Sequence, residues 1–199
     1  MNYRGIKIKT DDDVYEPCDD TFLLMDCLEG HIGKGERVLD LGAGTGILGI
    51  FCAMHGAKSV CVDINPFAVK LAQENAKSNG VEVEAIKSDM FENVKGKFDV
   101  IIFNPPYLPT EEHDKIPGAL NYAFDGGKDG NDAIFHFIGE FENYLAPGGR
   151  VYILLSSLND VEKIREKFEE NEFKSKKMAE RAFDFEKLFV YVITSQPSS

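Results

Sequence analysis

The sequence Asn104-Pro105-Pro106-Tyr107 stands directly behind a continuous apolar run, and it has the residue types to act on a nitrogen. Two prolines fix the backbone and remove two N–H donors, so the turn offers acceptors, the Asn104 side-chain oxygen and the Pro105 carbonyl. A planar NH₂ group fits between two acceptors. Acceptors placed out of its plane would direct the nitrogen lone pair toward a methyl group, while Tyr107 stacks on the planar substrate. The turn therefore indicates methylation of an amide or aryl amine.

A second motif, Asp40-Leu41-Gly42-Ala43-Gly44-Thr45-Gly46, joins a short apolar run to a helical segment. Its glycines let the backbone turn sharply and approach a ligand closely. The overlapping run from Gly44 to Gly49 also matches the G-x-G-x-x-G pattern of dinucleotide-binding proteins, a weak signal by itself. A carboxylate at Asp40 would repel a pyrophosphate and attract the ammonium and sulfonium groups of S-adenosylmethionine. The charge of Asp40 therefore favours S-adenosylmethionine as the ligand. The alternative ligand is a nicotinamide dinucleotide, which would make the protein an oxidoreductase.

Two further acids follow the next two predicted strands. Asp63 is placed to accept both hydroxyls of a ribose. Asp89 is placed to accept the exocyclic amine of an adenine, with Ile64 and Met90 closing on the ring. Each acid alone is more often a strand-end turn or a helix cap. Together with Asp40, beside a glycine loop, they predict a nucleoside site at the carboxyl ends of successive strands.

Elements that could position these residues alternate along the chain. Apolar bursts separated by helical patterns predict a mostly parallel sheet with helices on both faces, and the short final connection predicts an antiparallel last strand. The polar stretch from Pro105 to Gly130 is too irregular for an element, and a loop of this length is typical of a functional lid or of disorder. We expect strands over 38–41, 59–63, 81–86, 98–103, 150–155 and 189–194, and helices over 19–28, 47–55, 66–79, 131–145 and 160–170.

Length and charge narrow the function classes. The 199 residues are enough for one domain with its own core. The formal net charge of −12 disfavours a nucleic-acid surface, which needs a basic face. No signal peptide or bilayer-spanning run is present, so we expect a cytoplasmic protein. Four cysteines without a CxxC pair read as buried hydrophobes, and the run Glu111-Glu112-His113-Asp114 lacks metal-ligand spacing, so no metal site is expected.

Two further stretches, from Val14 to Leu24 and from Ala123 to Gly130, resemble a known family, as do the glycine loop and the Asn-Pro-Pro-Tyr turn. The chain resembles the HemK-related, release-factor glutamine methyltransferases of archaea and eukaryotes, which belong to the class I S-adenosylmethionine-dependent enzymes. The resemblance implies a seven-stranded sheet with an antiparallel last strand. It also implies cofactor contacts at Tyr15, Thr21, Asp40, Gly42, Ala43, Gly44, Gly46, Asp63, Ile64, Asp89, Met90 and Asn104, and catalysis by Asn104, Pro105, Pro106 and Tyr107.

The same resemblance implies partners. The substrate would be the Gly-Gly-Gln loop of a class I translation termination factor, and a small zinc-binding activator would pair with an edge strand from Val81 to Ile86. Residues 1–30 would cover the cofactor site, 31–195 would form the methyltransferase core, and 196–199 would be a frayed tail. The Asn-Pro-Pro-Tyr turn by itself does not distinguish an amide from the exocyclic amine of a nucleobase, so that substrate stays open, as does a non-catalytic binding subunit.

Overall fold

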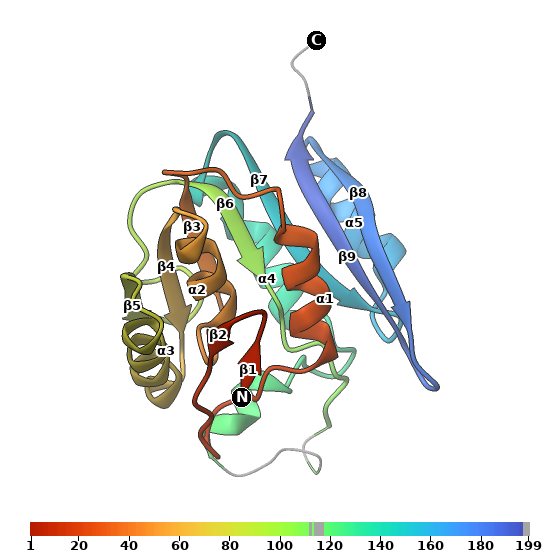
Figure 1. Cartoon of the computed structure of the whole chain (residues 1–199). Coiled ribbons are helices and arrows are strands. Elements are labelled where there is room, and N and C mark those ends of the chain that lie inside the picture. The colour runs from red at the N-terminus through yellow and green to blue at the C-terminus, as the bar shows by residue number, and fades with distance from the viewer. Residues whose placement is uncertain (112, 114–117, 197–199) are drawn as a thin grey trace.

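The computed structural model describes residues 1–111, 113 and 118–196. Its centre is a seven-stranded sheet in the order β5-β4-β3-β6-β7-β9-β8 (Figure 1). Residues 112 and 114–117 of the expected lid and acidic run, and 197–199 of the expected tail, lie outside the described residues. The strands of the sheet are β3 (Arg37–Leu41), β4 (Lys58–Asp63), β5 (Val83–Lys87), β6 (Phe98–Phe103), β7 (Leu145–Ser156), β8 (Phe173–Ala182) and β9 (Lys187–Ser195).

Strand direction confirms the predicted fold class. Strands β3 to β7 pair in parallel, and β9 lies antiparallel between β7 and β8. The carboxyl ends of the parallel strands therefore meet at one edge of the sheet, the edge at which open α/β sheets bind ligands. Strand β5 borders the sheet on one side and β8 on the other.

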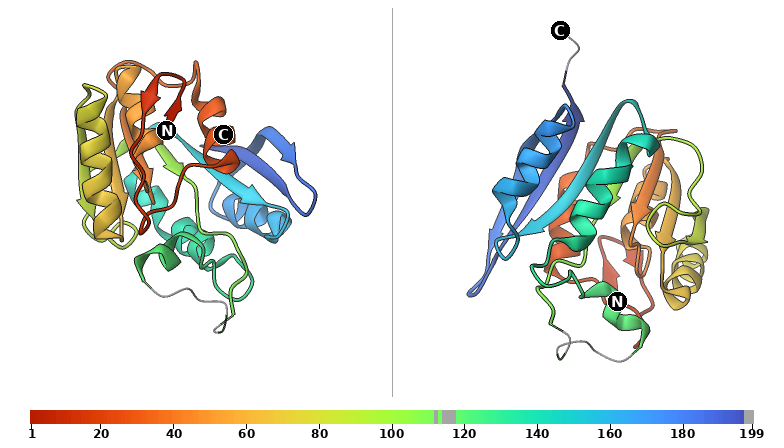
Figure 2. Two further views of the ribbon diagram at one scale, coloured as in Figure 1. Left: turned by 60° about the horizontal axis from the view of Figure 1, so that its bottom comes forward. Right: turned by 180° about the vertical axis from the view of Figure 1, so that it is seen from behind.

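Helices cover both faces of the sheet (Figure 2). Helices α1 (Asp19–Leu28), α2 (Ile47–Met54) and α3 (Pro66–Ser78) lie on one face, where α1 and α2 pack in one core with the N-terminal hairpin of β1 (Asn2–Tyr3) and β2 (Ile6–Lys7). Helices α4 (Asp132–Glu140) and α5 (Val161–Glu170) lie on the other. Strand residues alternate between the faces, so Val38 packs toward α2 and Leu39 toward α4.

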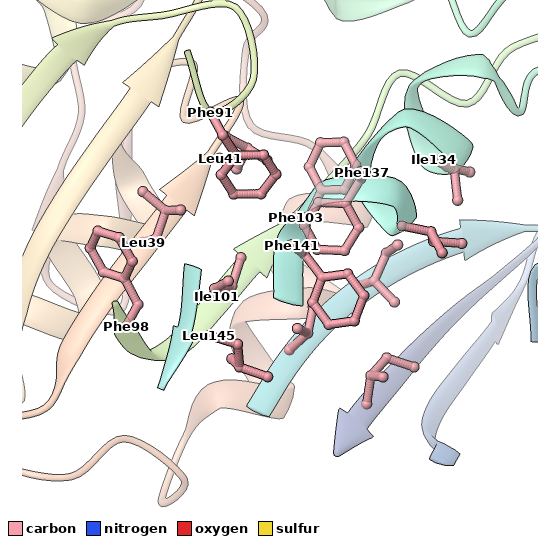
Figure 3. Packing of buried hydrophobic residues seen from close by; sticks show 14 of the residues in the cluster. Leu39, Leu41, Phe91, Phe98, Ile101, Phe103, Ile134, Phe137, Phe141 and Leu145 are labelled. Atoms are coloured by element: carbon pink, nitrogen blue, oxygen red, sulfur yellow. The ribbon is translucent and has the colours of Figure 1, made fainter. Parts of the chain in front are cut away.

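Aromatic rings dominate the core under α4 (Figure 3). Phe137 of α4 stacks on Phe103 of β6 and on Phe141, with ring centroids 4.8 and 5.1 Å apart. All three rings are almost completely buried. Burying each one stabilises the fold by about 1.5–3 kcal/mol. Because Phe103 immediately precedes Asn104, this packing fixes the end of β6 where the Asn-Pro-Pro-Tyr turn begins.

Several element boundaries differ from the sequence prediction. Strand β8 was not predicted, because half of the residues in its FKSKKMAERA sequence are charged and it lies at a solvated edge. Residues 147–149 belong to an irregular start of β7, where the register with β6 shifts. The helix expected to run to residue 145 ends at Glu140 and continues as the 3₁₀ helix η2 (Phe141–Tyr144).

One cysteine also departs from expectation. Cys27, Cys52 and Cys61 are buried, but Cys18 is exposed at the start of α1, so the expectation of four buried cysteines was wrong for Cys18. None of the helices in the described part of the chain is both long and apolar enough to cross a bilayer.

Candidate active site

A cavity of about 280 Å³ lies at the carboxyl ends of β3, β4 and β6. Three sequence-distant parts of the chain meet around it: the segment leading into α1, the glycine loop after β3, and the turn after β6. The 3₁₀ helix η1 (Ala119–Ala123), from the segment expected to be a lid, also lines it. Most of the predicted site residues line the cavity: Tyr15, Thr21, Gly42, Ala43, Gly44, Asp63, Ile64, Asp89, Met90, Asn104, Pro105, Pro106 and Tyr107.

The glycine loop is tied to the neighbouring strand by hydrogen bonds. The Ala43 N–H donates to the Val62 carbonyl at 2.9 Å, and the Gly44 N–H donates to Asp63 Oδ2 at 2.8 Å. Gly44 and Gly46 adopt φ values of +53° and +80°, which other residues rarely adopt. A Cβ on Gly46 would also stand 2.7 Å from the Ala72 Cβ of α3. The loop therefore needs glycine at Gly46 for packing, although Gly46 does not line the cavity.

Asp40 lies behind the loop rather than in the cavity. It is 2 % exposed and its Oδ2 accepts the Gly49 N–H of α2 at 2.9 Å. The Cys61 thiol is 3.8 Å from the same oxygen. Burial raises the pKa of Asp40 to about 7. The residue thus joins β3 to α2, and it is not among the residues that line the cavity.

The raised pKa of Asp40 gives the folding stability a defined pH dependence. Below pH 4 the group is protonated in both states; between about pH 4 and 7 only the unfolded chain loses the proton, so stability falls as pH rises. About three pKa units correspond to at most about 4 kcal/mol, levelling off above pH 7. Urea unfolding from pH 4 to 8 should show a larger loss in the native protein than in Asp40→Asn, which keeps only the contribution of other groups such as Asp63, whose pKa burial also raises. Parallel curves for the two proteins would contradict the assignment.

The acids that do reach the cavity are Asp20, Asp63 and Asp89. Asp63 is mostly buried, and its Oδ1 also accepts the Asn65 N–H at 2.9 Å. Burial raises its pKa, and the hydrogen bonds from backbone N–H groups oppose that rise. The described residues that line the cavity include no lysine or arginine. The electrostatics therefore suit a cationic ligand and oppose the pyrophosphate of a dinucleotide.

We expect Asp63→Ala to weaken binding of S-adenosylmethionine by about 10²-fold, the loss of a charge-assisted bidentate contact. Turnover at saturating donor should change only a few-fold, since Asp63 lies on a different strand from the Asn-Pro-Pro-Tyr turn. Isothermal calorimetry measures the first quantity and initial rates the second. Asp12→Ala, at an exposed acid outside the cavity lining, is the matched control and should bind as the native protein does. A dissociation constant within threefold of native for Asp63→Ala would refute the assignment.

Asn104 is held in one orientation by Asp20. Its Nδ2 donates to Asp20 Oδ2 at 2.9 Å, which leaves Oδ1 as the free acceptor. That Oδ1 is buried and has no hydrogen-bond partner in the described structure. A buried acceptor without a partner is costly, so it marks a position for a ligand donor. The predicted acceptor of the turn is therefore present, with a carboxylate behind it that the sequence did not single out.

Two tyrosines flank this pair. The Tyr15 hydroxyl donates to Asp20 Oδ2 at 3.2 Å, and Tyr107 follows the second proline. Burial raises the pKa of both hydroxyls, and the nearby charge of Asp20 raises each further. Both tyrosines stay neutral at physiological pH. Both line the cavity, and neither can act as a base in this state.

The stretch from Ala123 to Gly130 packs against the turn, which explains its glycines. A Cβ on Gly130 would lie 2.4 Å from the Tyr107 carbonyl oxygen, and one on Gly126 would lie 3.0 Å from the Pro106 carbonyl. Asn159, at the end of β7, donates through Nδ2 to the Tyr107 carbonyl at 3.2 Å and to the Gly130 carbonyl at 2.8 Å. The turn is thereby held from two sides.

Sequence reasoning missed several cavity residues. Phe124 meets Tyr15 edge to face at 5.5 Å, and Leu120 and His136 complete the wall, although no role was predicted for His136. Thr45 Oγ1, in the glycine loop, is a second buried polar atom without a partner. No local pattern marks these residues, because they come together only when η1 and α4 fold over the loop. Asp20 stands beside Thr21 in the N-terminal stretch that carries the resemblance, but no pattern in the sequence indicated that Asp20 contacts Asn104.

The sheet order, the glycine loop, the strand-end acids and the unpaired acceptor define a class I methyltransferase. The chain belongs to the methyltransferase small domain family, whose model matches residues 7–181. It is 51% identical over 191 residues to a Methanocaldococcus jannaschii protein named, by inference, a protein N5-glutamine methyltransferase, covering 96% of each chain. It is 35% identical over 162 residues to methyltransferase HEMK2 of Mus musculus, covering 76% of each.

A solved structure has the same fold. It is the E. cuniculi Mtq2–Trm112 complex, described as responsible for methylation of the translation termination factor eRF1. The similarity has a TM-score of 0.74 at 24% identity, and it covers 92% of this chain and 99% of that one. These relatives confirm the resemblance to the HemK-related glutamine methyltransferases.

Proposed function

We propose that this protein is an S-adenosylmethionine-dependent methyltransferase that modifies the side-chain amide of glutamine in a class I translation termination factor. The observation that carries the proposal is the Asn104 amide, whose nitrogen is held by Asp20 and whose oxygen is an unpaired buried acceptor. A primary amide offers the two N–H donors that this acceptor and the Pro105 carbonyl require. A cytoplasmic location follows from such a substrate, since translation termination takes place there.

The cavity fits the methyl donor. In this proposal Asp63 accepts the ribose hydroxyls and Asp89 the adenine amine, and the support is that both acids line the cavity together with the apolar Ile64 and Met90. Thr45 Oγ1 offers an unpaired polar atom beside the glycine loop. When bound, S-adenosylmethionine supplies a methyl group on a positively charged sulfur, which is already an activated leaving group. The segment up to residue 30 contributes Tyr15 and Thr21 to this site.

The chain's own residues supply orientation. Asn104 Oδ1 and the Pro105 carbonyl accept the two amide hydrogens and hold the nitrogen still. These acceptors stabilise the transition state, because positive charge grows on the nitrogen as it is methylated. Holding the nitrogen in line with the methyl group also lowers the barrier, because the two reacting atoms are already aligned. Tyr107 stacks on the amide plane. The proton leaves after methylation, because the alkylated amide nitrogen is acidic, so no strong base is required.

The charge of the protein favours a protein substrate over a nucleobase. The described cavity-lining residues carry acids and no lysine or arginine, and the whole chain has a net charge of −12. A nucleic-acid substrate would meet this field with its phosphates and be repelled. A basic protein would be attracted by the same field.

The test is mass spectrometry of the termination factor after incubation with the enzyme, S-adenosylmethionine and the activator. We expect one added methyl group on the glutamine of the Gly-Gly-Gln peptide, and none when that glutamine is replaced by asparagine. Total RNA from the same source is the second substrate. Methylation of RNA with none on the factor, under conditions where calorimetry shows donor binding, would assign the enzyme to nucleobases instead.

We further propose that a small zinc-binding activator pairs with β5. This strand hydrogen-bonds only with β4 among the described strands, and Val83, Ala85 and Ile86 are half-buried along it. An edge strand with apolar side chains is a template for strand addition. At the opposite edge, half of the residues of β8 are charged, which discourages such pairing.

Hydrogen exchange distinguishes the two edges without altering either. In the complex with the activator, amides of residues 83–87 should exchange at least tenfold more slowly than in the free protein, because new hydrogen bonds protect them. Amides of residues 173–182 on β8 serve as the internal control and should not change. Protection confined to β8, or a complex with no change at β5, would show that the activator docks elsewhere.

A further inference from the structure

The connection between β8 and β9 ends in two exposed aromatic residues. The residues Phe183-Asp184-Phe185-Glu186, here called the hairpin tip, close with a hydrogen bond from the Phe183 N–H to the Glu186 carbonyl at 2.8 Å. Phe185 is 96 % exposed and Phe183 is 38 % exposed. A phenylalanine as exposed as Phe185 contributes almost nothing to the core, and aromatic side chains are enriched at protein–protein interfaces.

The hairpin tip is attached to the active site through a short series of hydrogen bonds. Ser156 Oγ donates to Glu186 Oε2 at 2.8 Å, and the Ser156 N–H donates to Asn159 Oδ1 at 2.8 Å. Asn159 in turn donates to the Tyr107 carbonyl. The Lys187 N–H also donates to Ser157 Oγ at 2.9 Å, so the base of the tip is fixed to the end of β7.

The tip lies at the same end of the sheet as the cavity (Figure 1). Figure 1 shows the β8–β9 turn at the same end of the sheet as η1, which lines the cavity. The Glu186 carboxylate is close enough to Tyr107 to raise the pKa of its hydroxyl, after burial and Asp20. Leu158, which is 43 % exposed, lies in the chain turn between Ser156 and Asn159. An exposed apolar residue, Leu158, thus lies in the same turn as Asn159, which contacts the Tyr107 carbonyl.

Acids alternate with the aromatic rings at the tip. Asp184 is exposed and Glu186 is half-exposed. The surface therefore combines apolar area with negative charge. A segment that carries apolar and basic side chains matches both properties, and charge complementarity speeds its encounter with a chain of net charge −12.

We propose that the hairpin tip binds a segment of the protein substrate that flanks the modified glutamine and carries apolar and basic side chains. The proposal rests on the proposed function, because a glutamine that reaches Asn104 must bring its own chain across the cavity mouth. The tip lies at the same end of the sheet as that mouth (Figure 1), and the exposed Phe185 ring is free to be buried. It gives the enzyme a contact with the folded substrate that lies outside the reacting amide.

The experiment compares Phe185→Ser and the double variant Phe183→Ser/Phe185→Ser with the native protein on two substrates. One is the whole termination factor, and the other is a six-residue peptide centred on the glutamine, too short to reach the tip. We expect KM for the factor to rise at least tenfold with kcat unchanged, and the peptide kinetics and donor affinity to stay at native values. Met54→Ser, a 47 % exposed apolar residue at the end of α2, is the matched control.

The outcomes separate the two proposals. A native protein that methylates neither substrate overturns the proposed function, and this inference with it. A native protein that methylates the factor, with variants of native KM, overturns the tip alone. Equal losses on factor and peptide would show that the tip shapes the cavity instead. Loss of a dimer in Phe185→Ser, seen by light scattering, would show that a second copy is the occupant.

Discussion

Asn104→Ala should lose about 10³-fold in kcat, the range seen when one preorganised group at a developing charge is removed. The alanine removes the buried Oδ1 acceptor and leaves the Asp20 carboxylate without the Nδ2 donor. Binding of S-adenosylmethionine should weaken less than tenfold, because Asp63 and Asp89 are untouched. Single-turnover rates at saturating donor measure the chemical step, and calorimetry measures donor binding.

The control for Asn104→Ala is Asn171→Ala, at an exposed asparagine that ends α5. It should turn over at the native rate and melt at the native temperature. A native rate for Asn104→Ala would end the acceptor model, whatever the donor affinity. A loss of rate that simply follows a loss of folded protein would do the same, so circular dichroism accompanies each assay.

The parts of the fold that the sequence predicted are those with strong local periodicity. Strands β3, β4 and β6 are short apolar runs ended by glycine, proline or acids, and α1 was predicted at its observed bounds, Asp19–Leu28. Strand β8 was missed because half of its residues are charged, and only the folded sheet shows that it lies at an edge where they can face solvent. Its pairing partner β9 follows it along the chain, and its charged residues face solvent.

The candidate site divides in the same way. Glycine loops and the double-proline turn are local devices, so their residues were found and Gly42, Gly44 and Asn104 line the cavity. Asp40 shows the limit of such reasoning, since its spacing from the glycines said nothing of which way its side chain points. The link from Asp20 to Asn104 joins residues 84 apart in sequence, and only the folded chain reveals it.

That link makes Asp20 a positioning residue, and we expect Asp20→Ala to lose about 10²-fold in kcat, the cost of a misplaced reacting group. Without the carboxylate the Asn104 amide is free to rotate, and its Nδ2 can take the place of the acceptor. Substrate KM and donor affinity should change little. The measurement is kcat against KM for the peptide substrate, with calorimetry for the donor.

Rescue separates positioning from simple stability. Asp20→Asn keeps an oxygen that can accept from Asn104 Nδ2 at the observed 2.9 Å, so it should recover at least tenfold of the lost kcat. Asp19→Ala removes the exposed neighbouring acid and its ion pair with Arg181, and should cost no activity. If Asp20→Asn were as inactive as Asp20→Ala, the charge rather than the orientation of Asn104 would matter. Because Asp20 also accepts from Tyr15 and from Thr21 Oγ1, Tyr15→Phe and Thr21→Val variants that both keep native kcat would leave the Asn104 contact as the one that counts.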